Sequence, residues 1–179
     1  TIYIVNGMSP ITHFLVGWTA LERTQPTDRD KALVVLAGLA PDLDGLGIIV
    51  DFATRTLGLA ETNYYQEFHR VYGHGLPAAL AISALVACFA VHKYRAAAGA
   101  FVAVHLHFIC DILGSRGTGA EDIWGIAYFS PFAHRPVFEW RGQWELISWQ
   151  NTLITLILLG WMFARGMRAG YTPLRLASK

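Results

Sequence analysis

The chain has 179 residues, a length that suits one domain, and we treat residues 1–179 as a single domain. Hydrophobic residues make up 54% and charged residues 15%, so the chain is more apolar than an ordinary soluble domain. This composition favours a membrane or a large apolar surface buried on a partner. The net charge of +1 argues against a nucleic-acid partner held by a basic face.

The first helices are indicated by their end signals. Ser9 and Pro10 provide an N-cap and a proline at the first helical position, which predicts a helix over residues 11–23. A charged turn follows over residues 23–28. Thr27 caps a second predicted helix that ends near Pro41. Met8 could be the natural start, in which case residues 1–7 are an upstream extension.

Glycine and proline punctuate the rest of the chain, and few runs alternate with period two, so helices are favoured over strands. We expect an all-α fold, a helical bundle of two hairpins plus extra helices. A glycine-containing helix is expected over 45–59 and a short amphipathic helix over 62–72. A long apolar helical pair follows over 77–91 and 96–113, joined by 92–95. The last expected elements are a loop-rich segment over 114–142, with a short strand over 137–140, and a final helix over 148–165.

The apolar runs favour a membrane, although they are shorter than an ordinary spanning helix. A spanning helix needs about 20 apolar residues, whereas residues 77–91 and 152–164 provide fifteen and thirteen. Basic residues flank these runs as cytoplasmic positive charges would: Lys93, Arg95, Arg165 and Arg168. We expect membrane association, with a soluble helical enzyme as the alternative. The cysteines Cys88 and Cys110 form no CxxC motif and are interpreted as small core residues.

His107 and Asp111 are the first candidates for metal ligands. They are four residues apart on a predicted helix and therefore share a face. Asp111 lies in an apolar stretch, where a carboxylate is costly unless it is paired or bound to a cation. Imidazole and carboxylate are ordinary ligands of zinc and similar ions. His105 lies on another side of the helix and is interpreted as a packing or supporting residue.

Asp42 and Asp44 follow the second predicted helix at its carboxyl end, where the helix dipole disfavours acids. A metal ion would explain them, and a solvated turn is the alternative because proline, aspartate and glycine form turns. His69 and His74 are separated by a segment that contains Gly73, so a break in the helix would let the two side chains converge.

Hairpin geometry brings these residues to one end. The first hairpin has its charged turn at one end, with His13 starting one arm and Asp42 and Asp44 ending the other. In the second hairpin His74 precedes one arm, and His107 and Asp111 close the other. The arms are similar in length, so both hairpins place ligand-type residues at one end and basic residues at the opposite end. We therefore predict a metal site.

The order of these motifs resembles a family of bacterial membrane-bound metal-dependent hydrolases, some of which are linked to the LexA regulon. The resemblance covers residues 8–132 and includes Trp124 and the Ser-Pro-Phe run at 130–132. The pattern resembles, more distantly, the all-helical zinc-dependent phospholipase C fold. The phospholipase C resemblance implies a bridging role for Asp111, and the resemblance to the membrane-bound hydrolases implies a location in the bacterial inner membrane.

With the resemblance, we expect one or two divalent ions, with zinc favoured and manganese the alternative. The expected ligands are His13, His69, His107, Asp111 and one of Asp42 and Asp44, the other orienting a water or acting as general base. His74 is either a ligand or the acid for the leaving group. Arg70 could hold a phosphate oxygen or be a surface residue.

The expected function is metal-dependent hydrolysis of phosphoesters, with lipid phosphoesters favoured by the apolar composition. The alternative is a non-catalytic membrane protein whose metal only locks the bundle. A nuclease on the related fold is disfavoured by the neutral net charge. The substrate, the metal and the oligomeric state do not follow from the residues.

Overall fold

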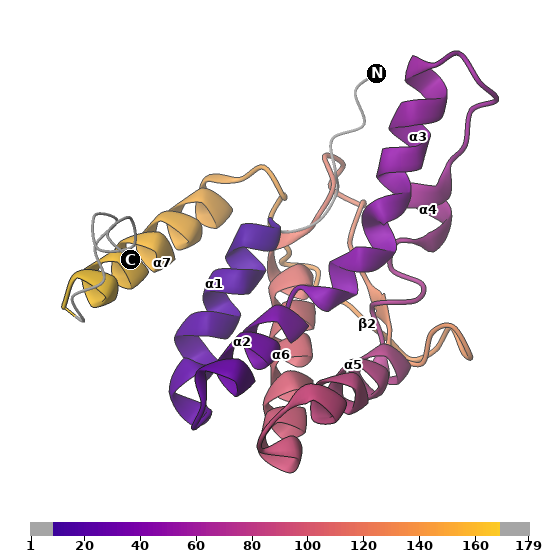
Figure 1. The fold of residues 1–179 in the computed structure, drawn as a ribbon. Helices are drawn as coiled ribbons and strands as arrows, with labels where there is room; N and C mark the ends of the chain where they lie inside the picture. Colours follow the sequence, from indigo (N-terminus) through magenta and orange to yellow (C-terminus); the bar gives the residue numbers. More distant parts are fainter. Residues whose placement is uncertain (1–8, 169–179) are drawn as a thin grey trace.

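A computed structural model describes residues 9–168, and its fold is all-α with one minor two-stranded sheet (Figure 1). This confirms the expected fold class. The expected extension over residues 1–7 lies outside the described residues. In chain order the elements are α1 (Pro10–Leu21), η1 (Glu22–Thr24), α2 (Asp28–Ala37), η2 (Ala40–Leu46), α3 (Gly47–Thr56), α4 (Tyr64–Phe68), α5 (Leu76–Phe89), α6 (Lys93–Gly114), β1 (Ile126–Ala127), β2 (Val137–Phe138) and α7 (Trp149–Arg168).

The first hairpin, α1 and α2, forms where its caps predict. The Ser9 hydroxyl accepts a hydrogen bond from the Ile11 N–H at 3.3 Å, and a proline opens α1. The Thr27 hydroxyl accepts from the Asp30 N–H at 3.1 Å and so caps α2. Each cap satisfies a backbone donor that a helix start leaves unpaired.

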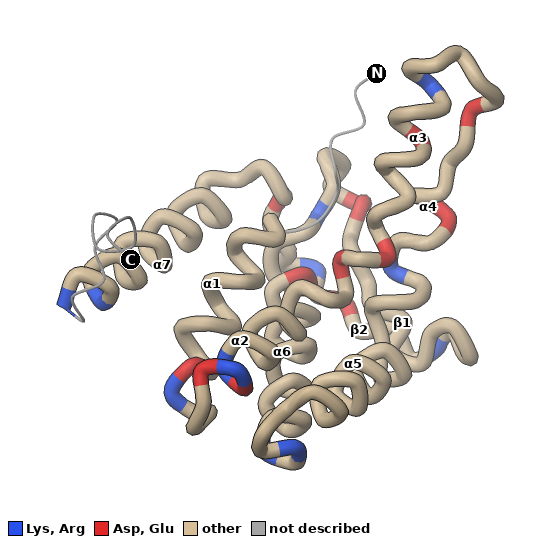
Figure 2. Tube along the Cα trace, in the orientation of Figure 1, with Lys and Arg blue, Asp and Glu red and all other residues tan. Residues whose placement is uncertain are grey.

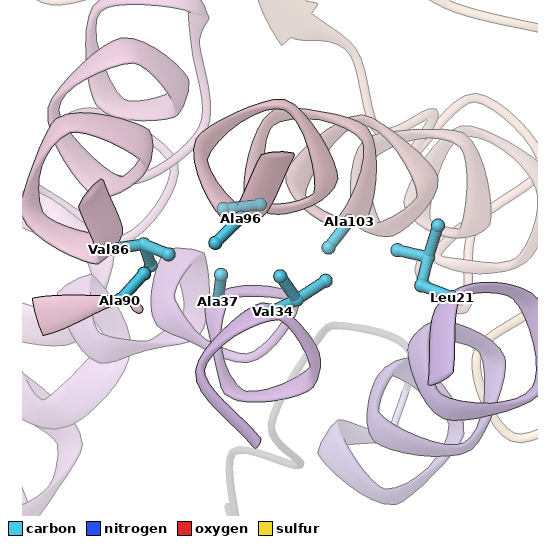
Figure 3. Close-up of a cluster of buried hydrophobic side chains, with 8 residues drawn as sticks. Leu21, Val34, Ala37, Val86, Ala90, Ala96 and Ala103 are labelled. Carbon is cyan, nitrogen blue, oxygen red and sulfur yellow. The ribbon is translucent and has the colours of Figure 1, made fainter. Parts of the chain in front are cut away.

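The second hairpin, α5 and α6, packs against the first around small side chains. Alanines on α6 let the α2 backbone approach closely, and Figure 3 shows their methyl groups facing Val34 and Ala37 of α2. Gly99 of α6 lies where an added Cβ would be 2.5 Å from the Gln25 amide nitrogen and 3.0 Å from a Val34 methyl group, so a larger residue there would push these side chains aside. The central helix α6 contacts α1, α2 and α5 and organises the bundle.

A buried aspartate joins the turns of the two hairpins. Asp30, fully buried at the start of α2, accepts hydrogen bonds from the backbone N–H groups of Val91 (2.8 Å) and His92 (3.1 Å). It also pairs with His92 Nδ1 at 2.9 Å. Arg95 Nε donates to the carbonyl of Thr24 at 2.6 Å. Both hairpin turns therefore lie at the same end of the bundle, as the sequence predicts.

The helix α7 runs beside α1 and in the same direction. Thr12 near the start of α1 bonds Thr155 at 2.7 Å, and Glu22 beyond its end pairs with Arg165. Helix α6 is, within residues 9–168, the one helix long and apolar enough to span a membrane, and the bent pair formed by α2 with η2 and α3 also passes that test as a unit. Length and composition alone are weak evidence for a span, because core helices share them.

Three local predictions are corrected by the structure. The amphipathic helix expected over residues 62–72 is only the five-residue α4, since the carboxylate of Asp51 caps its first turn and the chain turns away after Phe68. Cys88 is exposed and Cys110 partly so, although both are free as expected. Helix α5 ends at Phe89 and α6 begins at Lys93, so residues 90–92 connect them instead of residues 92–95.

Candidate metal centre

The ligand-type side chains come from four parts of the chain that meet at the end of the bundle opposite the hairpin turns (Figure 1). One lies in α1, two in η2, two in the loop between α4 and α5, and two in the last turns of α6. They are His13, Asp42, Asp44, His69, His74, His107 and Asp111. The structure thus brings together all seven residues that the sequence singles out as metal ligands or their neighbours.

Five of them form what we call the buried cluster, which consists of His13, Asp42, His74, His107 and Asp111. The Nε2 atoms of His74 and His107 lie 3.2 Å apart. Asp111 Oδ2 lies 3.1 Å from His107 Nε2 and 3.5 Å from His74 Nε2. Its other oxygen, Oδ1, lies 3.3 Å from His13 Nε2. Asp111 therefore has imidazole nitrogens facing both of its carboxylate oxygens.

These separations fit donors around a cation. Two donors that each lie about 2.1 Å from an ion in tetrahedral geometry are about 3.4 Å from each other. Within the described chain, four buried atoms of the cluster have no hydrogen-bond partner: both ring nitrogens of His13, Asp42 Oδ2 and Asp111 Oδ2. Buried polar atoms are normally satisfied, and a divalent ion held among His13 Nε2, Asp42 Oδ2 and Asp111 Oδ2 would satisfy these three.

Supporting contacts orient the cluster. The other ring nitrogen of His107, Nδ1, lies 2.9 Å from the carbonyl of Gly38, which aims Nε2 into the cluster. The Ser115 hydroxyl donates to Asp111 Oδ1 at 3.0 Å. Such partners fix the tautomer and rotamer of metal ligands.

The electrostatics of the cluster favour a positive charge there. Burial lowers the pKa of His74, but its contacts with Asp111 and Asp44 outweigh burial and raise that pKa to about 9. In the absence of a cation, a proton held on an imidazole provides the charge that the carboxylates require.

Asp42 forms the open side of the cluster. Its Oδ1 lies 3.6 Å from His107 Nε2 and 4.0 Å from His74 Nε2. The Asp42 side chain is 23% exposed, whereas the His74, His107 and Asp111 side chains are at most 2% exposed. The cluster therefore reaches the protein surface beside Asp42.

Asp44 has a different environment, because four donors occupy its carboxylate. Oδ2 accepts from the N–H groups of Arg70 (3.0 Å) and Gly73 (2.8 Å) and lies 3.1 Å from His74 Nδ1. Oδ1 lies 2.8 Å from His69 Nδ1. His69 and His74 thus converge, as the Gly73 break allows, but they converge on Asp44. By holding His74 Nδ1, Asp44 orients the His74 ring so that Nε2 lies in the buried cluster.

The loop between α4 and α5 has a strained backbone. Arg70 has φ of 76°, a left-handed conformation that is unusual for a residue with a long side chain. Its guanidinium carbon lies 3.2 Å from the ring centroid of Trp124, which is 1% exposed and packs edge-on against His69. At Gly73 an added Cβ would lie 2.2 Å from the carbonyl oxygen of Pro41, so no side chain fits there.

Sequence reasoning missed one organising residue, Gln143. Its buried amide nitrogen donates to the carbonyls of Asp111 (2.8 Å) and Trp124 (3.2 Å), and its oxygen accepts from the Trp124 N–H at 2.7 Å. Gln143 thereby ties the end of α6 to the loop that carries Trp124. Nothing in its sequence context distinguishes it from a surface glutamine. His105 bonds Tyr128 outside the cluster, as expected.

The model of one protein family, described as YdjM inner membrane protein, matches residues 8–177. The match covers every residue of the buried cluster and all of the described helices. No curated protein and no solved structure shows significant similarity to the chain.

Proposed function

Because the chain belongs to the YdjM inner membrane protein family, we propose that its buried cluster binds a divalent metal for hydrolysis of phosphoesters at that membrane. The family places the chain in the bacterial inner membrane. It assigns neither a metal nor a reaction, so the metal and the hydrolysis are our proposal. The donor atoms that lie together in the buried cluster, several of them without a hydrogen-bond partner, support the metal most strongly.

The donor set favours a reactive metal over a structural one. A structural zinc site is closed by four protein ligands, whereas a catalytic site keeps a position for water or substrate. The buried cluster has three imidazoles and two carboxylates, and its Asp42 side is open to solvent. Nitrogen-rich donor sets suit zinc, with manganese as the alternative.

Each residue has a role in this proposal. His13, His74, His107 and Asp111 would hold the metal, and contact through both Asp111 oxygens would allow it to bridge two ions. A divalent ion supplies Lewis-acid polarisation of a phosphoryl group and acidifies water. Asp42, with Oδ2 unpartnered and its side chain partly exposed, accepts the proton from the attacking water. Asp44 positions His74.

Arg70 points to an anionic substrate. Its backbone N–H binds Asp44, and its guanidinium covers Trp124 beside His69. A planar guanidinium next to a metal centre suits two oxygens of a phosphate. A phosphoester of a lipid is the favoured class because the protein lies in a membrane.

The test is metal analysis of the detergent-solubilised protein, purified without a metal-affinity column. We expect one or two transition-metal ions per chain in the wild type and loss of both metal and phosphodiesterase activity in His107→Ala and Asp111→Ala. His105→Ala is the matched control, because His105 lies on the same helix and bonds Tyr128 outside the cluster. Full metal content in His107→Ala and Asp111→Ala would refute the site.

The rival function is a membrane scaffold whose metal only locks the bundle. Melting with and without chelator separates the two. A structural metal governs folding, so its removal would lower the melting temperature strongly and no phosphoester would be cleaved. A catalytic metal leaves most of the helical fold in place when it is removed, and activity returns when zinc or manganese is added back.

A further inference from the structure

The two ends of the bundle differ in charge. The end that holds the hairpin turns, which we call the basic end, comprises η1, the first turn of α2, the start of α6 and the last turn of α7. Its basic residues are Arg23, Arg29, Lys31, Lys93, Arg95, Arg165 and Arg168, and its acids are Glu22, Asp28 and Asp30. Figure 2 shows blue positions at the α1–α2 turn, where red positions lie among them, and further blue positions below α5 and at the end of α7.

Contacts confirm that these three regions lie at one end. Arg95 donates to the Thr24 carbonyl, which links the start of α6 to η1. Asp30 binds the backbone of Val91 and His92, which links the start of α2 to the same turn. Arg165 pairs with Glu22, which brings the end of α7 to this end as well. The basic residues therefore occupy one surface although they are distant in sequence.

The opposite end, which carries the buried cluster, is acidic. Among residues 9–168 its acids are Asp42, Asp44, Asp51, Glu61, Glu67, Asp111, Glu121, Asp122, Glu139 and Glu145, and its basic residues are Arg55, Arg70, Arg116, Arg135 and Arg141. Two of these arginines are engaged within the fold, Arg70 over Trp124 and Arg116 with Glu145 at 2.9 Å. Short connections rich in lysine and arginine stay on the cytoplasmic side of bacterial membranes.

The distance between the two ends matches a bilayer. Along α6, a rise of about 1.5 Å per residue puts Asp111 about 27 Å from Lys93. The hydrocarbon layer of a membrane is about 30 Å thick. Between the ends, α5 and α7 expose apolar side chains such as Leu85, Leu156 and Ile157, and charged positions are missing from the middle of these helices (Figure 2).

We propose that the basic end lies in the cytoplasm and that the buried cluster opens at the periplasmic boundary of the hydrocarbon layer. The apolar faces of α5, α6 and α7 then contact lipid. The open Asp42 side of the cluster meets the headgroups of the periplasmic leaflet, so a substrate reaches it from that leaflet or from the periplasm. This orientation stands on charge and length and does not depend on the proposed hydrolysis.

Cysteine accessibility tests the orientation in the full chain. Both native cysteines are first replaced (Cys88→Ala and Cys110→Ala), and single cysteines are then introduced at exposed positions. At the basic end these are Asp28→Cys and Tyr94→Cys, and at the cluster end Ala120→Cys and Ala133→Cys. A membrane-impermeant maleimide is applied to bacterial spheroplasts before and after permeabilisation.

We expect Ala120→Cys and Ala133→Cys to react in intact spheroplasts, and Asp28→Cys and Tyr94→Cys to react only after permeabilisation. The reverse pattern would overturn the orientation. Equal reaction of all four in intact or only in permeabilised spheroplasts would overturn the spanning arrangement. Two positions at each end, each checked for a wild-type melting temperature, guard against one misfolded variant. Because labelling needs no substrate, these outcomes are independent of the metal and activity tests.

Discussion

Asp44 offers the sharpest test of how the buried cluster is built. Its carboxylate accepts from two backbone N–H groups and contacts Nδ1 of two histidines, one of which, His74, points its Nε2 into the cluster. In Asp44→Asn the amide keeps one acceptor oxygen and the shape of the side chain, but the negative charge is lost. Hydrogen bonds to a charged group are stronger than neutral ones by about 1 kcal/mol each, so four weakened bonds put an upper value of about 4 kcal/mol on the destabilisation.

The effect on metal binding separates positioning from ligation. Replacing the partner behind a metal ligand typically weakens binding about 10–100-fold. We therefore expect the zinc dissociation constant of Asp44→Asn, measured by competition with a chromogenic chelator, to rise by about that factor. Asp51→Asn is the matched control: its carboxylate also accepts from backbone N–H groups, of Tyr64 and Tyr65, and within residues 9–168 it bonds no histidine. It should lose stability and keep wild-type zinc affinity.

Two outcomes would refute this reasoning. Wild-type zinc affinity in Asp44→Asn would mean that Asp44 does not position His74 for the metal. Complete loss of zinc, equal to that in Asp111→Ala, would mean that Asp44 is itself a ligand and that its hydrogen bonds rearrange when metal binds. The sequence alone leaves that second possibility open, because it offers Asp42 and Asp44 as equivalent acids.

Arg70→Gly removes the guanidinium and relieves the left-handed backbone at φ of 76°, so the melting temperature should stay equal or rise. The KM for a phosphoester should increase about tenfold or more, and an unchanged KM would contradict a substrate role for Arg70. Gly73→Ala places a methyl group against the Pro41 carbonyl, so the free energy of unfolding measured in urea should fall by about 1–3 kcal/mol. The metal content should fall as well, and wild-type metal content would contradict this close approach. Asp30→Asn should cost about 1–3 kcal/mol in the same assay because the N–H groups of Val91 and His92 depend on its charge, yet leave metal content unchanged; metal loss would show that the two ends are coupled.

Much of the bundle follows from local sequence signals. Ser9 and Thr27 cap the helices that they predict, and the pairing of the helices into two hairpins places His13 near His107 although they lie far apart in the chain. The spacing of His107 and Asp111 directly gives a shared helix face. These features depend on periodicity and capping, which a sequence carries explicitly.

Other features depend on tertiary contacts that a sequence does not carry. The helix expected over residues 62–72 is cut short because the chain turns away after Phe68 and the Arg70 N–H binds Asp44, which is distant in sequence. The core assignment of Cys88 is wrong because an alanine-rich helix shows the same pattern whether a face meets protein or lipid. The role of Gln143 rests entirely on loop geometry.

The buried carboxylate of Asp30 also has a consequence for how the protein is made. The turn between α5 and α6 directs the N–H groups of Val91 and His92 to a carboxylate on the first hairpin. Asp30 is fully buried, and a buried carboxylate is costly without such donors, so the second hairpin docks fully only once the first has presented this carboxylate. Synthesis delivers the hairpins in that order. We therefore expect the N-terminal hairpin to act as a template during insertion, and the C-terminal half expressed alone to be degraded by membrane proteases.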